Sequence, residues 1–214
     1  KSDWITFSKK FIKDLGLEPN LFSTQINSYE DIIELFQIYQ RINGIILDLN
    51  QDLWRYISDG YFTLKNIKGE IGSSTMPQKI NPIDFENSAG NLKLSNGLLI
   101  VFIGNLAVSR LQRDLEDSTI IRNIGTAFGY SLLAYRKNIE GVKRIQVNQD
   151  IIVQDLNQDW GFLGEAVQQI LRMEGIKDPY SLVVDFIKGK KVDEKVWKEW
   201  IVNILNLEIS KQAK

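Results

Sequence analysis

The chain has 214 residues, of which 43% are hydrophobic and 25% charged, so it can bury the core of one large or two small domains. Its net charge of -1 gives no general attraction for nucleic acid, and the lack of cysteine excludes disulfides and thiolate metal sites within it. It also lacks histidine, the usual proton-transfer residue near neutral pH. Because the chain starts at Lys1 rather than Met, we expect a longer protein to extend before it.

Neither a signal peptide nor a membrane span is predicted. Residues 1–13 are polar and amphipathic, and the longest apolar run, 97–108, is interrupted by Gly104 and Asn105 and is too short to cross a bilayer. We therefore expect a buried helix at 97–108, a cytoplasmic location, and neither membrane nor nucleic acid as a partner.

The first long helix is predicted from Ser28, as its N-cap, to about Ile57. Apolar residues recur along it at three- and four-residue steps, and Asp31 completes a capping-box-like pair with Ser28. The segment 65–82 that follows has no usable periodicity and is rich in Gly, Ser and Lys. A loop of that length inside a compact domain is usually either functional or disordered.

A second long helix is predicted to begin with Asn81 as its N-cap and Pro82 as its first helical residue. Asp84 and Glu86 then fall in the first turn, where the helix dipole favours negative charge. The helix is expected to run to about Ser109.

A polar break over 110–117 precedes a third long helix, predicted from Ser118 to Ile145. Apolar residues cover more than one face of the second and third helices, which is typical of a bundle interior or a subunit interface. From Val147 the predicted helices become short, with Asp178 and Pro179 as one cap and first helical residue. We therefore predict an all-α fold with a bundle domain over 1–146 and a small helical domain over 147–214. Core packing is the expected role of five aromatic residues: Trp54, Tyr56, Phe102, Phe128 and Tyr130.

The segment 72–82 reads Gly-Ser-Ser-Thr-Met-Pro-Gln-Lys-Ile-Asn-Pro. Hydroxyls, one ammonium and loop amides that lead into a helix N-terminus make a good anion receptor. A serine there becomes a base if Lys79 and the loop amides stabilise its alkoxide. On composition alone, a polar surface loop with a helix cap is the more frequent explanation.

The order of these residues resembles the signature G-S-S-x-M-P-x-K-x-N-P of the fumarase/aspartase superfamily, and every fixed position is present. The continuations 83–92 and 109–119 are similar to the adenylosuccinate lyase branch of that superfamily. The resemblance extends from about Trp4 to about Lys191, with the signature loop spanning 69–82.

This resemblance implies a catalytic set of Ser73 as the general base, Lys79 beside the substrate carboxylate, and Glu86 as the carboxylate that orients a catalytic histidine. It also implies a larger substrate-binding set: Thr24, Gln25, Ser74, Met76, Asn81, Arg113, Ser118 and Arg122.

The last three of these match the nucleotide phosphate site of the family. Ser118 and Arg122 are four residues apart and share a helix face, and Arg113 can bind phosphate oxygens with two nitrogens. The acidic residues at 114, 116 and 117 must point away or pair with Arg110, or they would repel the phosphate. On spacing alone, a surface salt-bridge cluster explains the same residues better.

The resemblance further implies a homotetramer whose active sites each draw residues from three subunits. The implied reaction is β-elimination of fumarate from adenylosuccinate, giving AMP, and from the succinyl-carboxamide ribotide of purine synthesis, with no cofactor and no metal. The general acid of the family is a histidine from its N-terminal half, so we expect the chain alone to lack part of the active site. Two alternatives remain open: a sister lyase acting on argininosuccinate, fumarate or aspartate, and a non-catalytic helical assembly module.

Overall fold

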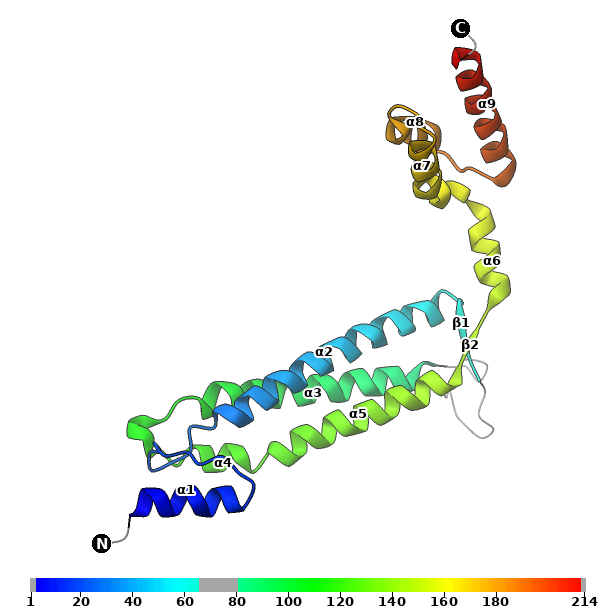
Figure 1. The fold of residues 1–214 in the computed structure, drawn as a ribbon. Coiled ribbons are helices and arrows are strands. Elements are labelled where there is room, and N and C mark those ends of the chain that lie inside the picture. Colours follow the sequence, from blue (N-terminus) through cyan, green and yellow to red (C-terminus); the bar gives the residue numbers. More distant parts are fainter. Residues whose placement is uncertain (1–2, 66–80, 213–214) are drawn as a thin grey trace. The chain divides into compact units, whose positions relative to one another are not determined.

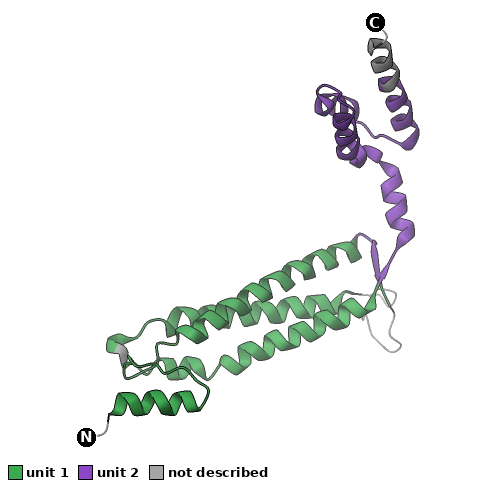
Figure 2. Ribbon diagram, in the orientation of Figure 1, with its two compact units in different colours: residues 1–58, 64–145 green, residues 59–63, 146–214 purple. Residues whose placement is uncertain are grey.

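The computed structural model describes residues 3–65 and 81–212 of the chain. Its contacts divide the chain into two compact units, 1–58 with 64–145 and 59–63 with 146–214 (Figure 2). Helices dominate both units, which confirms the predicted all-α class. No helix within the described ranges is both long enough and apolar enough to cross a membrane.

The first unit is built around three long helices that pack side by side, α2, α3 and α5 (Figure 1). Shorter elements precede and connect them. In chain order its helical elements are α1 (Trp4–Asp14), α2 (Glu30–Ser58), α3 (Ile83–Leu106), the 3-10 helix η1 (Arg110–Gln112), α4 (Asp117–Ile121) and α5 (Ile124–Arg144).

Both predicted N-caps of the long helices are wrong by one residue. Tyr29, with φ of 59°, stands between Ser28 and the start of α2, and its carbonyl accepts the first helical bond, from the Ile33 amide at 2.9 Å. At α3 the N-cap is Pro82, whose carbonyl accepts from the amides of Phe85 and Glu86 at 3.1 and 3.2 Å. Pro82 has the φ of a helix but a ψ of 46°, so it lies outside α3.

The predicted third helix is interrupted near its start. It forms α4 and α5, separated at Arg122 and Asn123. The Asn123 side chain donates to the Thr119 carbonyl at 3.3 Å, and such a bond competes with the backbone ladder of a helix.

The core of the bundle has an apolar end. Phe36 and Phe102 lie with ring centroids 5.4 Å apart and are almost fully buried. The predicted core role of Phe102 is therefore confirmed, and Phe128 packs on the same cluster. The buried members of this cluster are Ile33, Phe36, Leu99, Phe102, Leu106 and Ala127.

Further along, the same three helices bury polar side chains, which we call the polar seam: Asn43, Asn50, Ser88, Ser95, Ser131 and Asn138. Asn43 donates to Ser131 at 3.1 Å, and the Ser131 and Ser95 hydroxyls are 2.8 Å apart. One heptad on, Asn50 donates to Ser88 at 3.0 Å and accepts from Asn138 at 2.6 Å. These pairs show that α2 runs antiparallel to α3 and parallel to α5.

Two short strands were not predicted from the sequence. β1 (Phe62–Leu64) and β2 (Ile145–Val147) form a two-stranded sheet. The Lys65 amide donates to the Arg144 carbonyl in the first unit, and the Asn148 amide donates to the Tyr61 carbonyl in the second. This order is antiparallel. Strands of three residues are too short to show an alternating pattern.

The second unit is a small helical cluster. Its elements after β2 are α6 (Gln149–Gln158), the 3-10 helix η2 (Trp160–Leu163), α7 (Gly164–Met173), α8 (Pro179–Ile187) and α9 (Glu194–Gln212). Its buried core contains Leu171, Val183 and Trp197. The predicted cap of α8 is confirmed, because the Asp178 side chain accepts from the Ser181 amide at 3.2 Å.

Candidate active site

Four of the predicted site residues, Ser73, Ser74, Met76 and Lys79, lie outside the described residues. The others belong to the first unit: Thr24, Gln25, Asn81, Glu86, Arg113, Ser118 and Arg122. They fall into two groups, one at the start of α3 and one beyond its end.

The first group contains Asn81 and Glu86. The short turn from Asn81 through Pro82 leads directly into α3, and Glu86 lies in its first turn. The indole nitrogen of Trp54, on α2, donates to Glu86 Oε1 at 3.0 Å. This hydrogen bond between helices fixes one carboxylate oxygen of Glu86, and Glu86 is otherwise exposed.

The contact also corrects the predicted role of Trp54. Trp54 and Tyr56 are each 42% exposed, so the prediction that both are core residues is wrong. Trp is amphipathic, with an apolar ring and one N–H, and such a side chain often lies half in solvent with its N–H bonded. The helical periodicity of α2 placed Trp54 near the apolar face, but it gave no sign of a partner 32 residues away.

Sequence reasoning also missed an ion pair beside Glu86. The sequence predicts Asp84 only as an acidic residue in the first turn of the helix, yet its carboxylate accepts from Arg144 Nη1 of α5 at 3.0 Å. No local signal reveals a pair that is 60 residues apart in the chain.

The second group surrounds α4. Arg113 follows η1 and Arg122 follows α4, and both are exposed. Neither makes an ion pair within the described part of the chain. Ser118 donates its hydroxyl to the Leu115 carbonyl at 2.8 Å, which leaves the oxygen lone pairs available as acceptors.

Two of the three acidic neighbours of this group, Asp114 and Asp117, are engaged in contacts of their own. Asp114 pairs with Arg110 Nε at 2.6 Å and accepts from the Glu116 amide at 3.0 Å. The hydrogen bond from Arg110, followed by that from Glu116, lowers the pKa of the Asp114 carboxyl to about 2. The predicted pairing with Arg110 is thus confirmed for Asp114. The Asp117 carboxylate accepts from the Tyr29 hydroxyl, and this bond, with burial, raises the pKa of Tyr29.

The bond between Tyr29 and Asp117 also ties the segment before α2 to α4. Thr24 and Gln25 precede it and are exposed, and the Thr24 hydroxyl donates to the Ile26 carbonyl at 2.7 Å. The segment between α1 and α2, which contains both residues, lies near α4 at one end of the bundle (Figure 1), so we assign them to the second group.

The two groups lie at opposite ends of α3. Asn81 and Glu86 are at its beginning, whereas Arg113, Ser118 and Arg122 come after its end. With 24 residues and a rise of about 1.5 Å per residue, α3 is roughly 36 Å long. A single nucleotide cannot reach both groups of one chain.

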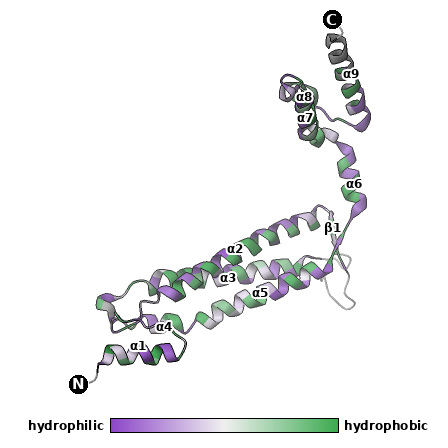
Figure 3. Ribbon diagram, in the orientation of Figure 1, coloured by the Kyte–Doolittle hydropathy of each residue, from purple (hydrophilic) through white to green (hydrophobic). Residues whose placement is uncertain are grey.

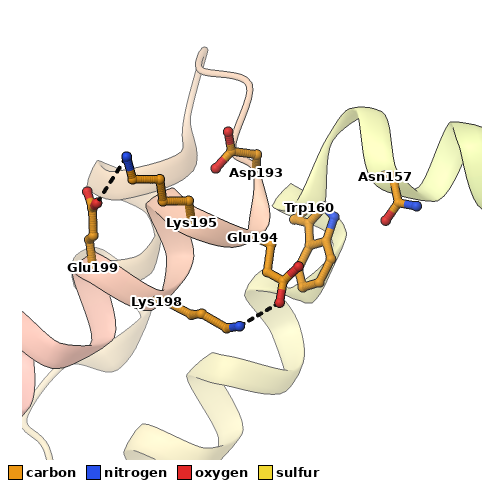
Figure 4. A pocket seen from close by; sticks show the side chains of 7 residues that line it. All are labelled: Asn157, Trp160, Asp193, Glu194, Lys195, Lys198 and Glu199. Atoms are coloured by element: carbon orange, nitrogen blue, oxygen red, sulfur yellow. Dashed lines mark hydrogen bonds and ion pairs between the residues drawn. The ribbon is translucent and has the colours of Figure 1, made fainter.

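The second unit holds a cavity of about 650 Å³, lined by Asn157 of α6, Trp160, Asp193 and residues of α9 (Figure 4). Lys198 pairs with Glu194 at 2.6 Å and Lys195 approaches Glu199 at 3.9 Å, so charges of both signs line it. None of the predicted site residues belongs to it. Among the described residues, no group of three or more Asp or Glu side chains is placed to hold a metal ion.

Comparison with known proteins supports the resemblance seen in the signature. Residues 109–214 match the model for the adenylosuccinate lyase C-terminal region, and residues 5–96 match the model for a general lyase family. The two matches together cover both groups of candidate site residues.

Individual relatives match over nearly the whole chain. The adenylosuccinate lyase of Escherichia coli (strain K12) is 46% identical over 199 residues, which cover 93% of this chain and 44% of the relative. That of Legionella pneumophila (strain Corby) is 45% identical over 212 residues, 99% of the chain and 46% of the relative. That of Dictyostelium discoideum is 44% identical over 197 residues, 90% of the chain and 42% of the relative.

The chain thus spans less than half the length of these relatives. Identity at this level over nine tenths of the chain, together with the two family models, shows that it belongs to the adenylosuccinate lyase family.

Proposed function

We propose that the chain is part of an adenylosuccinate lyase, which eliminates fumarate from adenylosuccinate to give AMP and from the succinyl-carboxamide ribotide of purine synthesis. The complete signature at 72–82, followed in the same chain by a second family-matching segment at 109–119, carries this proposal. A cytoplasmic location belongs to the proposal, as does the correspondence of residues 1–146 to the bundle domain and 147–214 to the small C-terminal domain.

In the proposed reaction, Ser73 removes a proton from the carbon next to a substrate carboxylate. Lys79 and Asn81 stabilise the resulting aci-carboxylate, and Ser74 and Met76 contact the substrate. The substrate carboxylate acts as the electron sink, so the residues named need no metal or cofactor. A histidine outside this chain then protonates the departing nitrogen, and Glu86 orients that imidazole while Trp54 holds Glu86.

Arg113, Ser118 and Arg122 bind the nucleotide phosphate in this proposal, and Thr24 and Gln25 contact the succinyl part. Both arginines are exposed and without an ion-pair partner among the described residues, and the nearby Asp114 is neutralised by Arg110. A phosphate set distinguishes a nucleotide substrate from argininosuccinate, fumarate or aspartate, which carry no phosphate.

We further propose that the active site is shared between the subunits of a homotetramer. The length of α3 supports this, because the start of α3 on one chain must meet the α4 end of another for one nucleotide to touch both groups. Hydrophobic and hydrophilic stretches alternate along the bundle helices (Figure 3). Exposed apolar residues on these helices are spaced at seven-residue steps, which is typical of helices that pack against further helices. They are Leu35, Ile42 and Leu49 on α2, Leu94 and Val101 on α3, and Leu132 and Ile139 on α5.

The test is a complementation assay that follows the loss of adenylosuccinate absorbance. The purified chain alone is expected to self-associate, since burial of its apolar faces contributes about 25 cal/mol per Å², but to show no turnover at any pH. Addition of the separately made N-terminal part of the same protein is expected to restore turnover. Robust activity of the chain alone would contradict the proposal that it holds only part of the active site. If both the mixture and the full-length protein are inactive, the proposed lyase function is contradicted.

A further inference from the structure

Arg144 joins two points that bracket the signature in the sequence. Its Nη1 donates to Asp84 Oδ2 at 3.0 Å, and its Nη2 donates to the Lys65 carbonyl at 3.4 Å. The backbone carbonyl of Arg144 in turn accepts from the Lys65 amide at 2.8 Å. One residue at the end of α5 therefore binds both Lys65 and the first turn of α3.

This ion pair is buried. The side chains of Arg144 and Asp84 are 10% and 13% exposed, respectively. A buried ion pair gives little net stability over well-packed apolar residues, because both charges lose their hydration. A planar guanidinium, however, presents several donors in a fixed geometry, so it can hold two acceptors at defined positions. The arrangement suits positioning better than stabilisation.

Gly141, one turn before Arg144, permits the close approach that the pair needs. A Cβ atom at Gly141 would lie 2.8 Å from the ring of Phe85 and 3.2 Å from Asp84 Cβ. Phe85 is itself almost fully buried, so its ring has little room to move. Helix α5 is therefore held directly against the first turn of α3, where Glu86 also lies.

We infer that Arg144 is a positioning residue for the proposed elimination: by tying the first turn of α3 to Lys65, it sets the place of Asn81 and Glu86. Asn81 lies three residues before Asp84 and Glu86 two residues after it, so a shift of Asp84 moves both. This inference rests on the proposed function. It assigns Arg144 and Asp84 a role in turnover without contact with the substrate.

The test measures kcat and KM for adenylosuccinate in the full-length protein with Arg144→Met, which keeps much of the side-chain volume and removes every donor. A misplacement of about 1 Å can cost on the order of 10²-fold in rate, so we expect kcat to fall by roughly that factor. The KM is expected to change far less, because the proposed phosphate residues lie at the other end of α3. Arg144→Lys should be intermediate, since one ammonium cannot hold both acceptors as the guanidinium does.

Lys137→Met is the matched control. Lys137 contacts the same Asp84 carboxylate, at 3.5 Å, but its closer partner is Glu140 at 2.7 Å, and it has no bond to Lys65. We expect its kcat to stay near that of the unsubstituted protein. An equal loss in Lys137→Met and Arg144→Met would contradict the positioning role, because both would then act only through the charge of Asp84.

Arg144→Ala with added guanidinium separates positioning from folding. Guanidinium ion at low concentration is expected to restore part of the kcat, whereas the same concentration of urea is not. An unchanged kcat in Arg144→Met, or an Arg144→Ala variant that folds and is not rescued, would overturn the inference. If the unsubstituted full-length protein does not cleave adenylosuccinate, the proposed function fails instead. Amide exchange at Lys65 and Glu86 then tests the structural tie by itself: faster exchange in Arg144→Met supports the tie, and unchanged exchange overturns it.

Discussion

The two ends of the bundle hold their candidate site residues in different ways. At the start of α3, side chains are fixed by contacts between helices, with Trp54 of α2 on Glu86 and Arg144 of α5 on Asp84. At the α4 end, Arg113 and Arg122 project from short turns and are exposed. Between the ends, side chains of the polar seam form hydrogen bonds that join α2, α3 and α5.

The difference follows the demands of the proposed chemistry. Proton transfer and orientation of an imidazole tolerate little displacement, so the groups involved need support from neighbouring elements. A phosphate carries its own charge and several acceptor oxygens, so arginines on an exposed turn can order around it when it binds. We therefore expect substitutions at the α3 end to change rates, and substitutions at the α4 end to change affinity.

The largest expected effect is that of Ser73→Ala in the full-length protein. A positioned base typically contributes on the order of 10²–10⁴ in rate, so turnover should fall by that factor or more. Binding of AMP, measured by calorimetry, should be unchanged, because other residues, Arg113, Ser118 and Arg122, are proposed to bind the phosphate. Turnover close to that of the unsubstituted protein would remove Ser73 from the reaction.

At the α4 end of the bundle, Arg113→Ala and Arg122→Ala should weaken the binding of phosphorylated ligands specifically. A hydrogen bond to a charged group is worth roughly 1.5–3 kcal/mol, so AMP should bind more weakly by about that amount in each variant. Adenosine, which lacks the phosphate, should bind as before, and calorimetry can compare the two ligands directly. An equal loss of affinity for AMP and adenosine would favour a surface salt-bridge role for these arginines and would contradict a phosphate site at the α4 end.

Trp54→Phe should give a smaller loss, in rate rather than affinity. The substitution keeps an aromatic ring on α2 but removes the N–H that donates to Glu86. If the lost hydrogen bond costs about 1.4 kcal/mol in the transition state, kcat falls roughly tenfold. Tyr130→Phe, which removes a hydroxyl from α5 without touching Glu86, serves as the control. A change in AMP affinity with constant kcat would contradict the proposal that Trp54 acts on the rate by holding Glu86.

The smallest expected effect concerns the Asp114 carboxyl. Its pKa is lowered from 3.8 to about 2, chiefly by the hydrogen bond from Arg110. The ionised carboxylate therefore stabilises the folded protein above pH 3.8, and this stabilisation is lost as the pH falls through 2. Replacement of Arg110 by Ala should return the pKa toward 3.8, as measured by NMR titration of the carboxyl carbon. A pKa that stays near 2 would mean that the hydrogen bond from the Glu116 amide, not the pairing with Arg110, keeps the pKa of this carboxyl low.

Local residue patterns predicted much of the fold. The apolar periodicity located α2, and the cap and proline signals located α3, each to within a few residues, whereas the helix predicted from Ser118 proved to be α4 and α5. Asp178 was identified as the cap of α8 because capping depends on neighbours in the chain. The caps at Ser28 and Asn81 were misplaced by one residue. There, Tyr29 adopts a left-handed conformation and Pro82 a non-helical ψ, which the residue types alone do not dictate.

What the sequence by itself determined was therefore the family, through the order of residues in the signature, and the two long helices α2 and α3, through apolar periodicity and cap residues. Only the tertiary structure decided which side chains meet: Trp54 with Glu86, Asp84 with Arg144, and Asn43 with Ser131, 88 residues away. It also placed the two groups of site residues at opposite ends of α3. The physical reason is that helix formation depends on residues within a turn or two, whereas such pairs depend on how whole helices pack and on the register between them.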